Sequence, residues 1–261
     1  MDIGFVNKAA FDSRTAALMY RKSAGDGLTG AEKHCLARIP PEARGAVLDV
    51  GIGAGRTTAA IAPMFARYIG IDYSEPLLKM AQSRFPVLDL RVMDARRLEF
   101  DAIFDCVIFS FNGIDAVDAS GRRLILSEMV RVLKPGGYLI YSTHHAGHAR
   151  VKVWMTRFWV RELLRSIDVL RPRRVVRALS NRAANFGRQG PAGGPGMLTV
   201  NDPGIFFSTL IMYVDPDAER TVLEGLGLAV EAMVGNGRSE PGYDARDAWV
   251  YIVARKELQQ G

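Results

Sequence analysis

Three closely spaced glycines follow an acidic residue in the segment VLDVGIGAGRTT, residues 47–58. The glycines are Gly51, Gly53 and Gly55, and Asp49 stands two residues before the first of them. Because glycine lacks a Cβ, the backbone can turn sharply here and approach a ligand closely. The apolar residues around Asp49 predict a short buried strand. The segment therefore predicts a cofactor cradle at the end of a strand.

Acidic residues also end the next two predicted strands. Asp72 follows the apolar run YIGI, where a carboxylate can accept hydrogen bonds from both hydroxyls of a ribose. Asp94 ends the third strand, and its carboxylate or the backbone of Ala95 could take the exocyclic amine of an adenine. Each acid alone could be a helix cap or a turn residue. Together they indicate an adenosine-containing ligand without phosphates, and Arg56, at the third glycine position of the pyrophosphate fingerprint, makes a dinucleotide the weaker interpretation.

Four segments in order, VLDVGIGAGRTT, YIGIDYSEPLL, RVMDARRLEF and RVLKPGGYLIYSTH, make the chain similar to the class I S-adenosylmethionine-dependent methyltransferases over roughly residues 43–143. Within them, GAGRTT, FSFNGID and LKPGGYLIYSTHH resemble a group of bacterial small-molecule methyltransferases. The resemblance implies an α/β, Rossmann-like, seven-stranded and mostly parallel sheet with an antiparallel last strand and helices on both faces. It also implies S-adenosylmethionine as cofactor. The residues expected to bind it are Asp49, Gly51, Gly53, Gly55, Asp72, Tyr73, Asp94, Ala95, Tyr20 and Phe111, the three aromatic rings being candidates to face the sulfonium.

Methyl transfer from a sulfonium mainly requires positioning, and an oxygen acceptor usually needs a base as well. Asn112 follows the fourth predicted strand, where this superfamily places groups near the methyl, although it could equally be a turn residue. His144 and His145, just past the fifth strand, are the candidate bases, with His144 the first choice, and local packing is an equally good explanation. The pattern His-His-x-x-His lacks a clear fourth ligand, so we expect no metal.

From residue 46 onward, strand and helix patterns alternate, which predicts a parallel sheet with right-handed crossovers. Strands are expected at 46–50, 67–71, 88–93, 104–110 and 137–143, and helices at 7–22, 29–38, 56–65, 75–84, 120–133 and 216–226, with LAVEAMV and AWVYIVARK as closing strands. Thr29 and Glu32 predict a capping box. The expected organisation is cofactor-covering helices at 1–42, an α/β core at 43–145, a helical lid insertion at 146–212 and the rest of the core at 213–261.

The insertion accounts for the net positive charge of the chain. The chain has a net charge of +6, whereas residues 150–188 hold eleven basic residues and two acids. The segment VKVWMTRFWVRELLRSIDVL predicts an apolar helical stripe of Val151, Trp154, Phe158 and Leu163, and the glycine-rich and proline-rich NFGRQGPAGGPGMLTVNDPG predicts a loop. The basic lid could hold an anionic substrate, or it could be a merely solvated face; we weight these two equally, a membrane surface next and RNA last.

Two cysteines provide no disulfide framework, and no apolar run is long enough for a signal peptide or a membrane span, so we expect a soluble cytoplasmic protein. No Asn-Pro-Pro-aromatic motif is present, which argues against DNA bases, and no acid stands directly at the fourth strand's end, which argues against a magnesium-dependent catechol site. We expect methylation of an oxygen or nitrogen of a small molecule, such as a glycan precursor or secondary metabolite, which could be anionic, by a monomer or homodimer with at most peripheral membrane contact. The alternatives are a binding scaffold without turnover, an RNA-directed or lipid-directed methyltransferase, and polyamine synthesis, which the basic lid disfavours.

Overall fold

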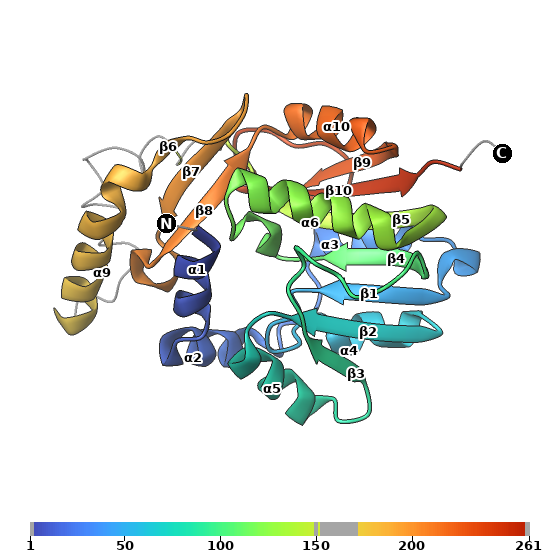
Figure 1. Cartoon of the computed structure of the whole chain (residues 1–261), viewed down its shortest axis with the longest axis horizontal. Helices are drawn as coiled ribbons and strands as arrows, with labels where there is room; N and C mark the ends of the chain where they lie inside the picture. Colours follow the sequence, from blue (N-terminus) through green and yellow to red (C-terminus); the bar gives the residue numbers. More distant parts are fainter. Residues whose placement is uncertain (1–2, 149–150, 152–171, 259–261) are drawn as a thin grey trace.

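A seven-stranded sheet forms the centre of the molecule in the computed structural model, which describes residues 3–148, 151 and 172–258 (Figure 1). Its strands run in the order β3-β2-β1-β4-β5-β10-β9. Their bounds are β1 Ala46–Val50, β2 Arg67–Asp72, β3 Asp89–Val92, β4 Phe104–Phe109, β5 Leu133–His144, β9 Leu228–Gly235 and β10 Trp249–Lys256. β1 to β5 pair in parallel, and β10 pairs antiparallel with both β5 and β9. The predicted fold class and antiparallel last strand are therefore confirmed, and that last strand lies inside the sheet beside β9.

Helices cover both faces of this sheet, because its strands carry apolar side chains on both sides. On one face, side chains such as Leu48 and Ile69 pack against α6 (Ala119–Val132) and α10 (Pro216–Gly225). On the other face, Val47 and Ile108 pack against α3 (Gly30–Ala37), α4 (Thr58–Ile61) and α5 (Glu75–Arg84). The helix predicted at 56–65 is shorter, since it tightens to a 3₁₀ turn at Ala62–Met64, where Pro63 cannot donate a helix hydrogen bond.

Two N-terminal helices, α1 (Ile3–Phe11) and α2 (Arg14–Ser23), occupy the region for which one helix was expected. The single helix predicted over 7–22 is wrong, because Ser13 is extended and its side chain accepts a hydrogen bond from the Ala16 amide, which starts a new helix. The capping box of Thr29 and Glu32 at the start of α3 is confirmed. Asn7 of α1 is fully buried and donates to the carbonyls of Ala116 (2.7 Å) and Leu210 (2.6 Å). This side chain fixes the N-terminal helices next to the carboxyl ends of the central strands.

The insertion contains a helix and a small second sheet. α9 spans Pro172–Asn185, and the antiparallel sheet consists of β6 (Gly190–Pro191), β7 (Met197–Asp202) and β8 (Thr209–Val214). The loop predicted from residue 185 onward is thus wrong at 197–202, since the alternating run MLTVND pairs along its whole length with β8. The apolar stripe of Trp154, Phe158 and Leu163 lies outside the described residues. No helix in the described part of the chain has the length and apolar character to cross a membrane.

Candidate functional site

The glycine loop after β1 adopts the sharp turn that its sequence predicts. Gly51, Gly53 and Gly55 all have left-handed backbone angles, with φ values of 65°, 55° and 78°. A Cβ at Gly51 would lie 2.3 Å from the ring of Phe109, and one at Gly53 would lie 3.1 Å from the ring of Tyr20. Any larger residue here would be strained and would collide with its neighbours. The loop therefore keeps bare backbone at the carboxyl edge of the sheet.

Asp72, the last residue of β2, faces this loop. One of its carboxylate oxygens accepts from the Gly53 amide and the other from the Ser74 amide, both at 2.7 Å. The side chain is buried, and burial raises its pKa to about 6 although the two amide hydrogen bonds act to lower it. Each carboxylate oxygen has a second lone pair. Asp72 can therefore accept further hydrogen bonds from ligand hydroxyls without leaving the loop.

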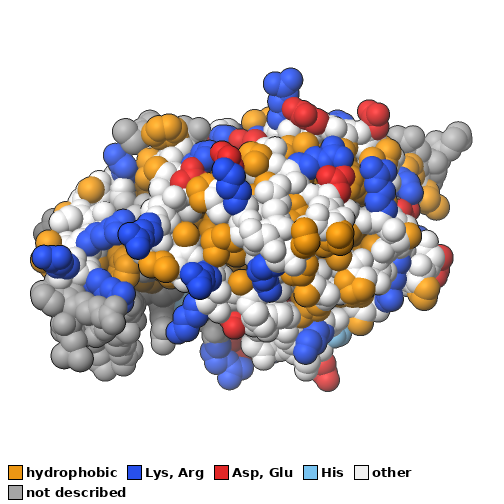
Figure 2. Space-filling model, turned by 90° about the horizontal axis from the view of Figure 1, so that it is seen from below, with side chains coloured by type: hydrophobic (Ala, Val, Ile, Leu, Met, Phe, Trp, Pro, Cys, Tyr) orange, Lys and Arg blue, Asp and Glu red, His pale blue; other side chains and the backbone are white. Residues whose placement is uncertain are grey.

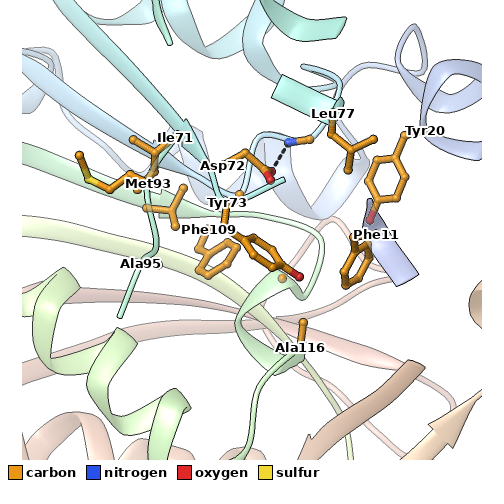
Figure 3. A pocket seen from close by; sticks show the side chains of 14 residues that line it. Phe11, Tyr20, Ile71, Asp72, Tyr73, Leu77, Met93, Ala95, Phe109 and Ala116 are labelled. Atoms are coloured by element: carbon orange, nitrogen blue, oxygen red, sulfur yellow. Dashed lines mark hydrogen bonds between the residues drawn. The ribbon is translucent and has the colours of Figure 1, made fainter. Parts of the chain in front are cut away.

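A cavity opens beside Asp72, as Figure 3 shows. Phe11 and Tyr20 from the N-terminal helices form one side, and Met93 and Ala95 lie on the opposite side. The hydroxyl of Tyr73 in this cavity is buried and has no hydrogen-bond partner among the described residues. Burial, and then the nearby charge of Asp72, raise the pKa of Tyr73. A buried hydroxyl without a partner is costly, so this one is available to a polar ligand group.

A second cavity adjoins the first, and Tyr20 and Gly51 line both of them. It is also lined by Asp49 and by Arg56, whose guanidinium pairs with Glu32 and lies 4.8 Å from the Phe111 ring centroid. No local pattern in the sequence indicated the pairing of Arg56 with Glu32. Tyr20 is thus in contact with both parts of the space around the glycine loop.

Asp49 is almost completely buried in this second region. Its carboxylate accepts a hydrogen bond from the Tyr68 hydroxyl at 2.8 Å. Burial raises the pKa of Asp49 to about 7, and the Tyr68 hydrogen bond opposes that rise. In the folded protein, the Asp49 carboxyl is therefore only partly ionised near neutral pH.

Asp94 does not line either cavity, although its neighbours Met93 and Ala95 do. Its carboxylate is engaged by Arg96, whose backbone amide donates at 2.9 Å and whose guanidinium donates at 2.7 Å. The Arg96 hydrogen bonds lower the pKa of Asp94 although its partial burial would raise it. Contact between Asp94 and an adenine stays a prediction, and Ala95 is the better placed of the two.

The turn after β4 holds two strained residues. Phe111 and Asn112 both have left-handed backbone angles, with φ values of 59° and 60°. Such angles cost free energy in residues other than glycine and are found preferentially at functional sites. The backbone amide of Asn112 donates to the Ser142 hydroxyl at 2.9 Å. The side-chain oxygen of Asn112 is buried without a partner in the described structure. Ser110 and Phe111 of this turn line the second cavity, and Gly113 lines the first.

His144 and Asp115 form a hydrogen-bonded pair behind this turn. The Nδ1 atom of His144 lies 2.9 Å from one oxygen of Asp115, and the same oxygen accepts from the His144 backbone amide at 2.7 Å. A carboxylate can only accept, so Nδ1 carries the proton, which leaves the Nε2 lone pair to accept a proton. The Asn112 side-chain nitrogen lies 3.4 Å from this Nε2. The sequence-predicted Asn112 and His144 are therefore brought together.

Asp115 is itself held by a buried ion-pair chain. Its other oxygen accepts from Thr143 at 2.8 Å and from Arg122, and Arg122 also donates to Glu219 at 2.5 Å. Burial would lower the pKa of Arg122, but the charges of Glu219 and Asp115 raise it above its ordinary value. The guanidinium lies between the two buried carboxylates and donates a hydrogen bond to each of them. Asp115 is thereby fixed as the acceptor for Nδ1.

Aromatic rings surround the exposed part of His144. Its ring centroid lies 4.7 Å from that of Tyr213 in β8 and 6.4 Å from that of Trp249 in β10. Both rings come from distant parts of the chain, so no local sequence signal could have assigned them. His145 lies elsewhere: its Nδ1 is 3.2 Å from the Asp247 carbonyl and its ring packs on Tyr243. The part of the chain described here holds no group of three or more potential metal-ligating side chains.

Comparison with known proteins identifies related chains. Residues 47–137 match the family described as "Methyltransferase domain". Demethylmenaquinone methyltransferase of Renibacterium salmoninarum is 37% identical over 97 residues, which cover 37% of this chain and 40% of that one. The chain spans less than half the length of three curated relatives that it matches, for which the coverage is 40%, 47% and 42%.

Two solved structures share the fold over most of their length. An S-adenosylmethionine-dependent methyltransferase from Clostridium acetobutylicum aligns with a TM-score of 0.59 at 11% identity, over 87% of this chain and 91% of the other. An S-adenosylmethionine-bound amino pentose methyltransferase from Micromonospora echinaspora aligns with a TM-score of 0.55 at 18% identity, over 94% of this chain and 97% of the other. At these identities, the likeness concerns the fold alone.

Proposed function

Through its fold and residues 47–137, the chain belongs to the class I S-adenosylmethionine-dependent methyltransferase superfamily, and on that premise we propose that it methylates a hydroxyl of a small molecule. The observation that carries this proposal is the Asp115–His144 pair next to the turn that lines both cavities. A base is needed for a hydroxyl, whereas a neutral amine can react once its lone pair is aimed. A nitrogen acceptor is therefore the second choice.

The residues around the glycine loop fit S-adenosylmethionine. Gly51 and Gly53 keep Cβ atoms out of the loop, Asp72 retains lone pairs for the two ribose hydroxyls, and the orphaned Tyr73 hydroxyl provides a further polar partner. Ala95 and Met93 would face the adenine, and Tyr20 would lie between the nucleoside and the methionine portions. The Phe111 ring, already next to a guanidinium, is suited to face a cation.

When bound, S-adenosylmethionine supplies a methyl group on a positively charged sulfur that is already activated as a leaving group. The protein's part is positioning and proton transfer. The Nε2 atom of His144 takes the acceptor's hydroxyl proton, and Asp115 holds the imidazole in the required tautomer and stabilises the imidazolium that forms. The side-chain amide of Asn112, which lies beside Nε2 of His144, can orient the acceptor oxygen. Asp115 acts through His144 and is a positioning residue.

The acceptor is proposed to be small and to have an apolar part. Tyr213 and Trp249 flank His144 and provide aromatic surface for such a molecule. Relatives include enzymes whose names specify small acceptors, such as demethylmenaquinone and trans-aconitate. The basic insertion remains our reason to include anionic acceptors among those tested.

Transfer of a labelled methyl group tests this proposal. The purified protein would be incubated with methyl-labelled S-adenosylmethionine and a panel of small hydroxylated acceptors, including acidic ones. The wild type and the control His34→Gln, a partly buried histidine of α3 outside both cavities, should give a labelled product. His144→Gln should bind the donor normally but lose the product. The proposal fails if no acceptor in the panel is labelled, or if His144→Gln retains the rate and pH profile of the wild type.

A further inference from the structure

The helices α2 and α9 form one continuous surface, which we call the α2–α9 face. The guanidinium of Arg177 in α9 donates to the Thr15 hydroxyl in α2 at 3.1 Å. Leu18, Met19 and Lys22 of α2 and three arginines of α9 line a shared cavity of about 520 Å³. In Figure 1 both helices lie on the same side of the molecule, beyond the carboxyl ends of the central strands.

Six exposed cations stand on these two helices, and neither helix carries an acid. Four of them line the shared cavity, whereas Arg14 and Arg21 line a neighbouring cavity between α2 and α5. The sequences RTAALMYRKS of α2 and PRRVVRALSNRAAN of α9 contain no Asp or Glu. The exposed cations are Arg14, Arg21, Lys22, Arg173, Arg174 and Arg177. Within the described residues none of the six takes part in an ion pair, whereas many other exposed arginines, such as Arg91 and Arg246, pair with acids. No acid of the described residues therefore pairs with these cations.

Aliphatic side chains stand exposed among these cations. Leu18 is 59% exposed, Met19 46% and Val176 62%. Figure 2 shows the same interleaving, with blue and orange side chains together and few red ones on the side that carries α9. Helices that present cations and large aliphatic groups on one surface are typical of proteins that lie at the interface of an anionic bilayer.

We propose that the α2–α9 face docks on the surface of an anionic phospholipid bilayer. The cations would meet lipid phosphates, and Leu18, Met19 and Val176 would enter the boundary between headgroups and acyl chains. The exposed apolar residues of the two helices are aliphatic, whereas single-stranded RNA is bound by exposed aromatic rings on which bases stack. The observations thus favour a bilayer over RNA.

Docking would also hold the site at the bilayer. α2 carries Tyr20, which lines both cavities beside the glycine loop, so the helix that contacts lipid is also the helix that covers the site. The inference concerns binding to lipid and does not depend on the proposed methyl transfer. A protein that fails to bind lipid could still transfer methyl groups, and a protein that fails to transfer methyl groups could still bind lipid.

Co-sedimentation with vesicles tests the proposal. The full chain should bind vesicles of phosphatidylcholine mixed with phosphatidylglycerol, and should bind vesicles of phosphatidylcholine alone far more weakly. Binding should weaken as salt is added, since screening acts on exposed charges. Each cation is worth about a fivefold change in binding, so removing three should weaken it by about 100-fold. The α9 variant for this purpose combines Arg173→Gln, Arg174→Gln and Arg177→Gln.

A matched control variant separates the effect of charge on the α2–α9 face from the effect of the overall charge of the protein. Lys33→Gln, Arg38→Gln and Arg67→Gln together remove the same charge from exposed positions outside the α2–α9 face and should leave vesicle binding nearly unchanged. A second variant, Leu18→Asn with Val176→Asn, should weaken binding without a change in charge. Circular dichroism checks that each variant folds.

Three results would overturn the proposal. The first is equal binding to neutral and anionic vesicles, or no binding to either. The second is an equal effect of the α9 variant and its matched control. The third is salt-dependent binding of single-stranded RNA in the absence of vesicle binding, which would assign the face to nucleic acid.

Discussion

Replacing Asp49 with asparagine is expected to stabilise the fold at neutral and higher pH while leaving it unchanged in acid. Asp49 is 1% exposed and its carboxylate has the Tyr68 hydroxyl as a hydrogen-bond donor at 2.8 Å. Burial of the carboxylate raises its pKa from 3.8 to about 7. Asparagine keeps the shape and a carbonyl oxygen that accepts from Tyr68, and it has no charge to bury.

The sign and the size of the stability difference between Asp49→Asn and the wild type follow from that pKa. A group whose pKa is higher in the folded state stabilises the fold fully below its unfolded pKa and loses that contribution as pH rises through the folded value. A rise from 3.8 to about 7 corresponds to about 4 kcal/mol. That shift already includes the opposing effect of the Tyr68 hydrogen bond. The variant should therefore exceed the wild type by about 4 kcal/mol above pH 7, or about 8–16 °C in Tm, and the difference should vanish near pH 4.

Thermal unfolding followed by circular dichroism at a series of pH values measures this difference. Asp101→Asn, at an exposed carboxylate, is the control and should change Tm little at any pH. The reasoning is refuted if Asp49→Asn has no higher Tm than the wild type at about pH 8, or if its gain is the same at about pH 4 and pH 8.

Three other substitutions test the site. Asp72→Ala should weaken S-adenosylmethionine binding by roughly 1.5–3 kcal/mol in calorimetry. The affinity of the wild type should fall about tenfold from pH 8 to pH 5, because protonation of the Asp72 carboxyl, whose pKa is about 6, removes an acceptor. A wild-type affinity that does not change with pH would contradict this. His144→Gln should lower kcat by about 10²–10⁴-fold without a change in donor Kd, and equal losses in both would assign His144 to donor binding instead. Arg122→Met leaves the buried carboxylates of Asp115 and Glu219 without their cation, so urea unfolding should show a loss of about 3–5 kcal/mol; a loss below about 1 kcal/mol would show that the pair is not buried as described.

The sequence predicted the central sheet well because its signals are local. Each strand is a short apolar run, and turn or capping residues mark its ends, so the strands could be located; the antiparallel last strand followed from the resemblance to the superfamily. The second sheet was missed because MLTVND lies in a segment rich in glycine and proline, and its partner TLIMYV follows only after a turn. The break between α1 and α2 depended on one capping side chain, Ser13.

At the site, the sequence predicted the glycine turn and the strand-end carboxylates, since both follow directly from residue type and position. It predicted His144, and it left Asp115, in the segment after the fourth strand, open between a place near the methyl and a helix cap, without predicting that the two residues pair. The Asp115 pair with His144 joins positions 29 residues apart, and Arg122 and Glu219 that hold it come from different helices. Tyr213 and Trp249 reach His144 only through the folding of the insertion and of β10. Such contacts are set by the three-dimensional packing and leave no local pattern in the sequence.

Whether the glycine loop holds an adenosyl cofactor is measured by isothermal titration calorimetry with S-adenosylmethionine, S-adenosylhomocysteine and NAD, each added separately to the purified protein. We expect both adenosyl ligands to bind with micromolar Kd and NAD not to bind, because Arg56 stands where a pyrophosphate site needs glycine. Binding of NAD, or of none of the three, would contradict that expectation.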